Sequence, residues 1–397
     1  MMPVRARTAA AAAAAALLAA CPCDTDLVPQ VDRAALDASL RLGTRYLLAN
    51  QKPDGRFTYE YDWRARRELP GDNQVRQAGA MWGLALIFAD EPSPEVERAL
   101  RRSIALFEGL SRVAPDGARY VVYPGDASGK MGTIAIFALT LIDYLRAGGA
   151  TFDAGERAQY EQVLDGLLRQ LVRARRPDGH FAGSYRHADG APVGDPNPYV
   201  DGEALLALVK AAKFLGRDDL RPIALSTARA GYWDNVVVAR ALHPDSDTTK
   251  GYYQWGSMAF FEIATADWPG ADRWPWRVIE MAYWMIDVHH TLRRTRNTAY
   301  AYEGLIHAWE LARRLGDRDA QRKIGRVIGY GLSKLTAWQV GGPIPSRCIG
   351  PPPDDPRALG GVQNHAREPV LRIDVTQHQM AAVLLARRYV YPPGRPR

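Results

Sequence analysis

The stretch "QKPDGRFTYEYD" at residues 51–62 holds a Pro-Asp-Gly triplet followed by aromatic residues, and the chain repeats this arrangement. Similar stretches are "APDGARYVVYPGD" at 114–126 and "RPDGHFAGSYRH" at 176–187. The triplets begin at Pro53, Pro115 and Pro177, so both steps (115 − 53 and 177 − 115) are 62 residues. A turn that recurs at a fixed interval is typical of a repeat architecture built from one supersecondary unit.

Helical periodicity fills the sequence between and beyond these turns. Asp153 with Glu156 has the pattern of a capping box, and Ser93 followed by Pro94 marks another helix start. Apolar residues at three- and four-residue spacing predict twelve helices. Their expected ranges are 34–50, 73–89, 93–113, 130–147, 153–175, 201–215, 217–240, 252–266, 272–294, 297–315, 317–339 and 374–390.

The lengths of the links between these helices alternate. Links such as "DEPS", "AGGATF" and "WPGA" are short, whereas most of the others are long, up to the stretch from about 340 to 373. Helical hairpins with every long loop on one face give this pattern, and six hairpins of about 62 residues close into a ring. The sequence therefore predicts an all-α (α/α)6 toroid with short β-hairpins in the loops on one face. We expect the Pro-Asp-Gly turns to cross the mouth of that ring.

Composition is compatible with a large folded core. Of 397 residues, 47% are hydrophobic and 24% charged, and the formal net charge is +7. The basic residues are spread over helical segments such as "ELARRLGDRDAQRK", which indicates solvated helix faces. No nucleic-acid reader motif is present in the sequence, so we expect no nucleic-acid partner.

The first residues read as a targeting segment rather than part of the fold. Arg5 and Arg7 precede an Ala/Leu stretch that is too short and weakly apolar for a spanning helix. The segment ends in "LAAC", which resembles the lipobox of bacterial lipoproteins. The resemblance implies lipidation of Cys21 and an anchor in the outer membrane if the source has two membranes. A plain secretory signal is the alternative. We thus expect a signal peptide at 1–20, a linker at 21–33 and the toroid domain at 34–397.

The cysteines do not indicate a metal site. Cys23 and Cys348 would be able to form a disulfide in an oxidising compartment, but their distance in sequence decides nothing. Neither belongs to a CxxC or Cys/His cluster, and the sequence contains no HExxH motif. We therefore expect neither a metal nor another cofactor.

The repeats resemble those of a known superfamily. "LLANQKPDGRF" and "LVRARRPDGHF" are similar to the Gln-x-x-Asp-Gly-x-aromatic repeats of the α/α-toroid superfamily, which includes squalene cyclases and protein prenyltransferases. The six-hairpin ring is also similar to that of many glycoside hydrolases, polysaccharide lyases and sugar epimerases. The resemblance implies the fold of most of residues 30–390. The sequence lacks the Asp-x-Asp-Asp motif of terpene cyclases and the Asp/Cys/His zinc ligands of prenyltransferases. It also lacks the Cys-Gly-x-Gln thioester motif of complement-type thioester domains, which belong to the same superfamily. None of these chemistries is therefore expected here.

Candidate site residues follow from the expected ring. Helices rich in small residues would form its inner wall, and their N-termini would gather at one mouth with unpaired N–H groups and partial positive charge. Such a pit favours glycans or other hydroxyl-rich or anionic ligands. The polar and aromatic residues at these starts are Asp72, Asn73, Arg76, Lys130, Asp201, Glu203, Gln254, Trp255, Asn297, Tyr302, Glu303, Arg372, Asp374, Gln377 and His378. Loop aromatics that would stack on sugar rings, or instead pack the loops, are Tyr59, Tyr61, Trp63, Tyr185 and Tyr199.

The carboxylates among these candidates divide into two groups. Asp72, Asp201 and Asp374 sit where N-caps belong, so capping is their expected role. Glu203 and Glu303 lie inside the first turns of inner helices, where burial would raise the pKa of a carboxyl group and suit a general acid. We predict these two as the pair of a glycosidase. Their structural alternative is a salt bridge to Arg76 or Arg372.

Function is therefore predicted as that of a lipid-anchored, extracytoplasmic, carbohydrate-active protein, first of all a glycoside hydrolase. A polysaccharide lyase or sugar epimerase is the second reading and would use a His or Tyr base such as His378 or Tyr302, with Asn297 or Arg76 neutralising a uronate. A non-catalytic envelope lipoprotein that binds a glycan, peptide or partner protein is the rival from another class.

Overall fold

A computed structural model describes residues 29–148, 152–346 and 348–394 of the chain. The expected signal peptide, Cys21 and Cys23 lie outside the described residues. No helix in the described part of the chain is both long and apolar enough to span a bilayer.

All twelve predicted helices are present, with most ends shifted by up to about five residues. The largest differences are in the expected helix 272–294, which ends at Asp287, and in the expected helix 217–240, whose first α-helical part is only Arg221–Tyr232. The outer helices are α2 (Arg33–Ala49), α4 (Pro94–Gly109), α6 (Ala154–Ala174), α8 (Arg221–Tyr232), α11 (Trp274–Asp287) and α13 (Arg318–Thr336). A π-helix (Trp233–Val238) extends α8 into the short α9 (Ala239–Leu242). The inner helices are α3 (Gln74–Asp90), α5 (Met131–Ala147), α7 (Pro198–Phe214), α10 (Asp247–Ala264), α12 (Ala299–Leu315) and α14 (Ile373–Tyr389).

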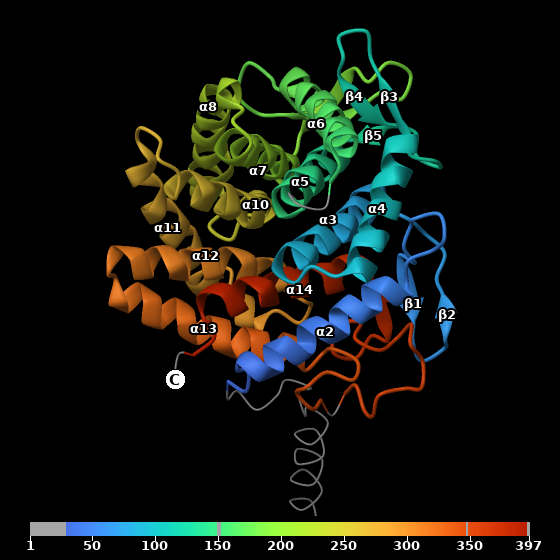
Figure 1. Cartoon of the computed structure of the whole chain (residues 1–397). Coiled ribbons are helices and arrows are strands. Elements are labelled where there is room, and N and C mark those ends of the chain that lie inside the picture. The colour runs from blue at the N-terminus through green and yellow to red at the C-terminus, as the bar shows by residue number, and fades with distance from the viewer. Residues whose placement is uncertain (1–28, 149–151, 347, 395–397) are drawn as a thin grey trace, which may run out of the picture.

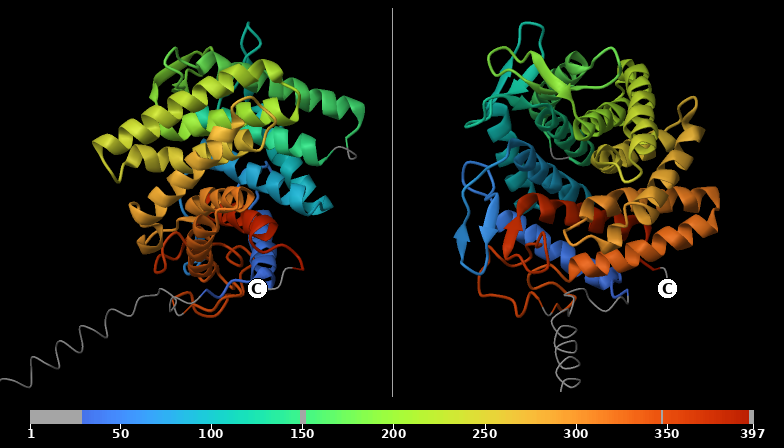
Figure 2. Two further views of the ribbon diagram at one scale, coloured as in Figure 1. Left: turned by 90° about the vertical axis from the view of Figure 1, so that its left-hand side faces the viewer. Right: turned by 180° about the vertical axis from the view of Figure 1, so that it is seen from behind.

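The inner helices form a closed ring, as predicted. Each packs on the next in the order α3, α5, α7, α10, α12, α14, and α14 returns to pack on α3 (Figure 1). The outer helix α2, from the start of the described chain, packs beside α14 from its end (Figure 2). These inner helices are apolar or small nearly all round; α5, for example, buries every residue from Met131 to Leu145. A helix of this composition is stable only when it is enclosed on all sides.

Short strands accompany the long loops on one side of the ring, on the right of Figure 1. The antiparallel sheets have the orders β2-β1-β8, β3-β4 and β5-β6-β7. In the first sheet, Tyr61 of β1 pairs with Glu68 of β2 and with Leu371 of β8, which ties the first long loop to the last. The strands are β1 (Glu60–Asp62), β2 (Arg67–Glu68), β3 (Ser111–Val113), β4 (Arg119–Val121), β5 (Gly129–Lys130), β6 (Ala182–Tyr185), β7 (Pro192–Pro196) and β8 (Val370–Arg372).

The three Pro-Asp-Gly triplets form the same turn. Gly55, Gly117 and Gly179 have φ of 93°, 82° and 95°, a region that favours glycine. Each glycine N–H donates to the carbonyl of the residue three before it, at 2.9–3.0 Å. The aspartate in each triplet accepts the N–H two residues later at 3.0–3.1 Å, as in an Asx-turn. The repeat is thus a requirement of local backbone geometry.

These turns do not cross the mouth of the ring, and that expectation was wrong. Each one packs on the next outer helix. The amide of Gln51 donates to the Ala99 carbonyl of α4 at 2.7 Å, and Arg175 donates to Ser226 of α8 at 2.7 Å. Gly117 lies against Arg169 of α6. The turns therefore join neighbouring outer helices, which explains why they recur with the hairpin period.

Three capping predictions were also wrong, whereas those at Ser93 and Asp153 are confirmed. The N-cap of α3 is Asn73 rather than Asp72, and its side chain accepts the N–H groups of Val75 and Arg76. Helix α7 is capped by Asn197 and has Pro198 in its first turn, so Asp201 lies inside the helix. Helix α14 begins at Ile373 without a side-chain cap, because the carboxylate of Asp374 binds arginines instead.

Candidate active site

The N-terminal ends of the inner helices surround a cavity of about 560 Å³, which we call the near cavity. Its wall includes nine of the predicted binding or catalytic residues, together with Lys130, Tyr199 and Gln377. The nine are Asn73, Arg76, Glu203, Gln254, Trp255, Asn297, Arg372, Asp374 and His378. The gathering of inner-helix starts at one mouth is therefore as expected.

Glu203 has the most perturbed carboxyl group in the near cavity. Its side chain is almost entirely buried and makes no hydrogen bond or ion pair with any described residue. Burial raises its pKa to about 8, against a smaller opposing effect of the Arg76 charge. The carboxyl group sits over Gly132 of α5, where a Cβ atom would come within 2.4 Å of its Oε2. Glu203 is therefore an uncharged acid at neutral pH.

Asp374 lies in the same cavity and has the opposite protonation preference. Arg76 and Arg372 each donate to its Oδ2 at 2.6 Å, and Arg372 also reaches Oδ1 at 3.0 Å. These two guanidinium groups hold the pKa of Asp374 below its usual range, although burial opposes them. The cavity thus combines a neutral carboxylic acid with a fixed carboxylate, and the structural alternative for Glu203, an ion pair with Arg76 or Arg372, does not occur.

His378 forms a dyad with Glu303. Its Nδ1 lies 2.9 Å from Glu303 Oε1, and the amide of Gln254 donates to Glu303 Oε2 at 3.0 Å. Gln254 Nε2 is also 3.1 Å from Nδ1, but Nδ1 cannot donate to one group and accept from the other at once. The charge-assisted bond to the carboxylate is the stronger of the two, which assigns the proton to Nδ1. The Nε2 lone pair of His378 is then available to a ligand.

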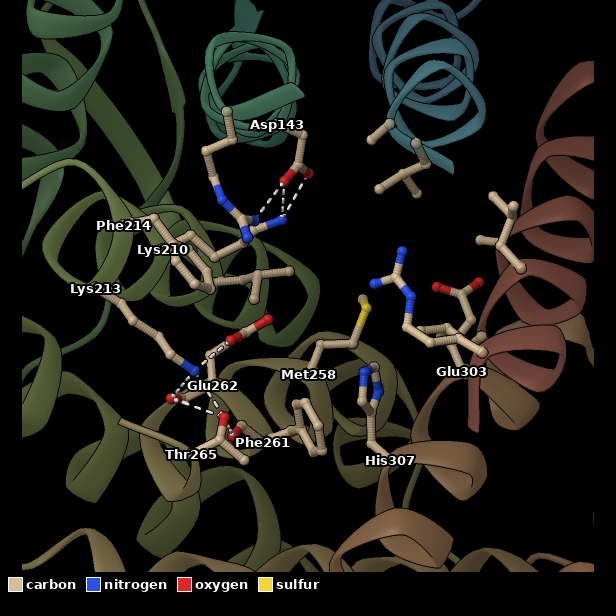
Figure 3. Close-up of a pocket in the computed structure, with 18 of the residues that line it drawn as sticks. Asp143, Lys210, Lys213, Phe214, Met258, Phe261, Glu262, Thr265, Glu303 and His307 are labelled. Carbon is tan, nitrogen blue, oxygen red and sulfur yellow. Dashed lines mark hydrogen bonds and ion pairs between the residues drawn. The ribbon is translucent and has the colours of Figure 1, made fainter. Parts of the chain in front are cut away.

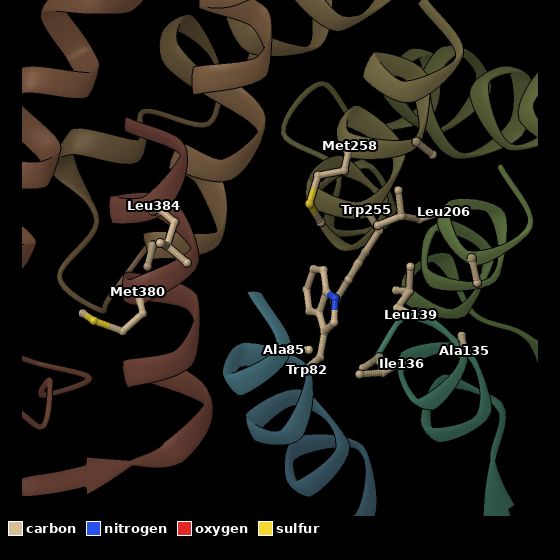
Figure 4. Packing of buried hydrophobic residues seen from close by; sticks show 14 of the residues in the cluster. Trp82, Ala85, Ala135, Ile136, Leu139, Leu206, Trp255, Met258, Met380 and Leu384 are labelled. Carbon is tan, nitrogen blue, oxygen red and sulfur yellow. The ribbon is translucent and has the colours of Figure 1, made fainter. Parts of the chain in front are cut away.

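Glu303 itself does not line the near cavity, which corrects its predicted role as a catalytic partner of Glu203. Its side chain is fully buried and borders a second cavity at the opposite mouth. Residues of the two cavity walls contact each other and form a partition between the cavities. It includes the His378–Glu303 pair, in which His378 lines the near cavity and Glu303 the second one. It also includes Trp82 and Trp255, whose ring centroids are 5.4 Å apart (Figure 4). Glu303 is thus placed to orient His378 rather than to touch a ligand in the near cavity.

No protein-family model and no curated protein matches the sequence. A GH76 alpha-mannanase of Bacteroides thetaiotaomicron matches in structure with a TM-score of 0.60 and 9% identity, over 91% of this chain and 96% of that one. A sugar epimerase from a ruminal bacterium matches with a TM-score of 0.62 and 9% identity, over 89% and 98%. Cellobiose 2-epimerase from Spirochaeta thermophila matches with a TM-score of 0.58 and 16% identity, over 88% of this chain and 96% of that one.

This chain has the (α/α)6 toroid fold. The predicted resemblance to six-hairpin glycosidase-like rings is confirmed at the level of architecture. At 9–16% identity the likeness shows the toroid alone, so the function of the site rests on its own residues.

Three predicted site residues of the toroid have structural roles instead. Tyr302 is buried against Gly331 of the outer helix α13 and faces away from the near cavity. Asp72 accepts hydrogen bonds from Tyr123 at 2.6 Å and from Gln77 at 2.7 Å. Asp201 accepts from the backbone N–H of Phe181 at 3.0 Å and lies 2.7 Å from His180 Nδ1. Asp72 and Asp201 anchor loops to inner helices.

Most of the loop aromatics also pack the toroid rather than line its cavity. Tyr61 donates to Asp355 at 2.7 Å, and the Trp63 indole donates to Gln363 at 2.8 Å. Tyr185 is fully buried, and Tyr59 lies beside the Arg372 guanidinium outside the cavity wall. Tyr199 is the exception, because it lines the near cavity and is 46% exposed. A sugar-stacking role is therefore open to Tyr199.

Sequence reasoning missed Tyr300, Asn197 and Asn364, which also line the near cavity. The sequence predicted a start of α12 at residue 297, whereas the helix begins at Ala299. For this reason Tyr302 was predicted to face the cavity, although Tyr300 is the tyrosine that lines it. The signal for α7 was present in the sequence as Asn197 followed by Pro198, an N-cap with proline at the first position.

Nothing in the described ranges forms a group of three or more His, Cys, Asp or Glu side chains with metal-binding geometry.

Proposed function

We propose that this toroid is a carbohydrate-active enzyme that abstracts a proton from a sugar carbon next to a carbonyl or carboxyl group, as epimerases, isomerases and lyases do. The observation that carries the proposal is that His378, held by Glu303, lines the same cavity as the neutral acid Glu203. The three structural relatives named above, a mannanase and two epimerases, act on carbohydrates and support this substrate class.

The proposed step uses His378 as base and Glu203 as acid. His378 Nε2 removes the proton from the carbon beside the carbonyl, and the electron pair of that C–H bond moves to form an enediol. Glu203 supplies a proton to the carbonyl oxygen, and the Glu303 carboxylate stabilises the imidazolium that His378 becomes. Return of a proton to carbon, or loss of a leaving group from the next carbon, completes an isomerisation or an elimination.

Glycoside hydrolysis is the second candidate. Glu203, with a pKa of about 8, suits a general acid, and Asp374 supplies an ionised carboxylate in the same cavity. Both oxygens of Asp374 are engaged by arginines, however, which weakens it as a nucleophile or base. This engagement is the reason for ranking hydrolysis second.

The test is turnover in D2O with glucose, mannose, cellobiose, mannan oligosaccharides and a polyuronate. Proton NMR reports exchange at carbon, ultraviolet absorbance reports unsaturated uronates, and reducing ends report hydrolysis. We expect exchange or elimination that falls on the order of 10²-fold or more in His378→Gln and in Glu203→Gln. The surface variant Arg186→Gln should match the wild type. Binding of a sugar without turnover, or new reducing ends that persist in His378→Gln, would overturn the proposed reaction.

We further propose that the protein is extracytoplasmic and anchored by a lipid on Cys21, with no other membrane attachment. The support is the charged start and the "LAAC" ending of the leader. Metabolic labelling with a fatty acid should mark the wild type and not Cys21→Ala, and the variant should leave the membrane fraction. An unlabelled wild type would refute the anchor.

A further inference from the structure

A second cavity of about 510 Å³ opens at the C-terminal ends of the inner helices, and we call it the far cavity (Figure 3). Its floor is apolar and comes from four different inner helices. The floor side chains are Trp82, Leu206, Met258, Phe261 and Leu384. These side chains offer an apolar contact surface within the far cavity.

The rim of the far cavity carries more positive than negative charge. Five cationic side chains line it against three carboxylates. Two of the cations are neutralised, because Lys210 pairs with Asp143 at 2.5 Å and Lys213 with Glu262 at 2.7 Å. The third carboxylate, Glu303, is already bound to His378 and Gln254 across the partition. The excess charge resides on Arg146, Arg314 and Arg388.

These three guanidinium groups retain free donors. Arg146 reaches Asp143 at 3.3 Å, Arg314 binds Glu310 through Nε at 2.8 Å, and Arg388 lies 3.9 Å from Asp90. Each guanidinium has five N–H donors, so these contacts leave several unused. Their side chains are 38–53% exposed. Arginines at the C-terminal ends of helices also compensate the helix dipoles, which would explain their positions. That effect does not explain the histidine in the same cavity.

His307 is the observation that indicates a ligand. It lines the far cavity and is directed toward the same space as Met258 in Figure 3. It is only 6% exposed, and its Nδ1 makes no hydrogen bond of good geometry in the described chain. Burial lowers its pKa to about 4, although the Glu262 carboxylate and the Glu303 carbonyl favour the charged ring. The buried Nδ1 has only the Glu303 backbone carbonyl, at poor geometry, as a partner, and a bound polar group would satisfy it better.

We propose that the far cavity binds a small amphipathic anion, with an apolar body on the floor and a carboxylate, sulfonate or phosphate group at the arginine rim. The apolar floor and the cationic rim require both parts in one molecule. The proposal does not rest on the chemistry proposed for the near cavity, although the two sites share Glu303 in the partition.

Calorimetric titration of the whole protein with three probes tests the proposal. Toluene-4-sulfonate has both the apolar body and the anion, inorganic sulfate has the anion alone, and benzyl alcohol has the body alone. We expect saturable binding of toluene-4-sulfonate that is at least about tenfold tighter than binding of either other probe. Equal binding of sulfate, or no saturable binding of toluene-4-sulfonate, would overturn the proposal.

Matched variants locate the site. Arg314→Gln and Arg388→Gln should each weaken toluene-4-sulfonate binding by about tenfold, since each removes a charged hydrogen-bond donor. Lys130→Gln, at the near cavity, should leave it unchanged. Circular dichroism establishes that each variant is folded. Loss of binding in Lys130→Gln but not in the arginine variants would place the probe in the near cavity and refute the assignment.

Discussion

The carboxyl group of Glu203 is buried between inner helices without a hydrogen bond from any described residue, and this isolation determines its chemistry. The charge of Arg76 acts to lower the pKa of Glu203, but the Arg76 guanidinium is already paired with Asp374 at 2.6 Å. Desolvation therefore outweighs attraction, and the acid stays protonated up to a pH of about 8. A residue that must deliver a proton at neutral pH needs this balance.

The same balance makes Glu203 a pH-dependent cost to stability. The pKa of Glu203 is 4.5 in the unfolded chain and about 8 in the folded protein. With respect to this group, the protein therefore has its full stability below pH 4.5 and loses stability as the pH rises from 4.5 to about 8, because only the unfolded state releases the proton in that range. We expect Glu203→Gln to match the wild type near pH 4.5 and to exceed its free energy of unfolding at pH 9 by up to about 4–5 kcal/mol. Urea denaturation at both values measures this. Equal stability at pH 9 would mean that the carboxyl group is not desolvated.

At the scale of one element, the third Pro-Asp-Gly turn shows how loops are fixed to helices. His180 follows the turn directly, and its Nδ1 lies 2.7 Å from Asp201 inside α7. Its Nε2 lies 3.0 Å from Asp234 in the π-helix. The two carboxylates raise the pKa of His180 to about 9, and the hydrogen bond to Asp201 contributes most. The charged imidazole thus links a turn, an inner helix and an outer helix.

This link has its own pH dependence. The pKa of His180 rises from 6.5 to about 9 on folding, so the stabilisation is complete below pH 6.5 and is lost as the pH rises through 9. We expect His180→Gln to lower the free energy of unfolding by about 1–3 kcal/mol at pH 6 and by much less at pH 10. Denaturation at the two values, with Arg186→Gln as control, checks it. A loss of the same size at both values would contradict the ionic origin.

The sequence predicted the helices of the ring well and their first turns poorly, for a physical reason. Inner helices such as α5 consist of small and apolar residues over almost their whole length, so the composition of the sequence is enough to predict them. Their starts depend on one capping residue each, and two candidates often stand close together, as Asp72 and Asn73 do. A shift of two residues rotates the inward face, which is how Tyr302 replaced Tyr300. Pairing of Glu303 with His378, 75 residues apart, has no local signal.

At the scale of the whole molecule, closure depends on the seam between the first and last inner helices. Gly83 of α3 faces Gln377 of α14, and a Cβ atom at Gly83 would lie 2.6 Å from the Gln377 Cγ. The seam therefore has room for glycine alone. It also positions the near cavity, because Arg76 and Asp374 lie on these same two helices and pair across it.

Substitution at the seam tests its contribution. Gly83→Ala should destabilise the protein by roughly 1–3 kcal/mol through overpacking, partly offset by about 0.5–1 kcal/mol of reduced backbone entropy loss. Gly109→Ala in α4 is the matched control, because nothing lies within 4 Å of its added Cβ. It should be neutral or slightly stabilising. Thermal unfolding of both variants decides the matter, and a Gly83→Ala protein as stable as its control would show that the seam is loosely packed.

The most direct test of the proposed site is a crystal structure of the Glu203→Gln variant with the reducing sugar that the wild type turns over fastest. We predict a sugar in the near cavity, with its carbonyl oxygen within hydrogen-bond distance of the side chain at position 203. The adjacent carbon should face His378 Nε2. A sugar bound in the far cavity or on the outer helices, with the near cavity empty of it, would contradict the account.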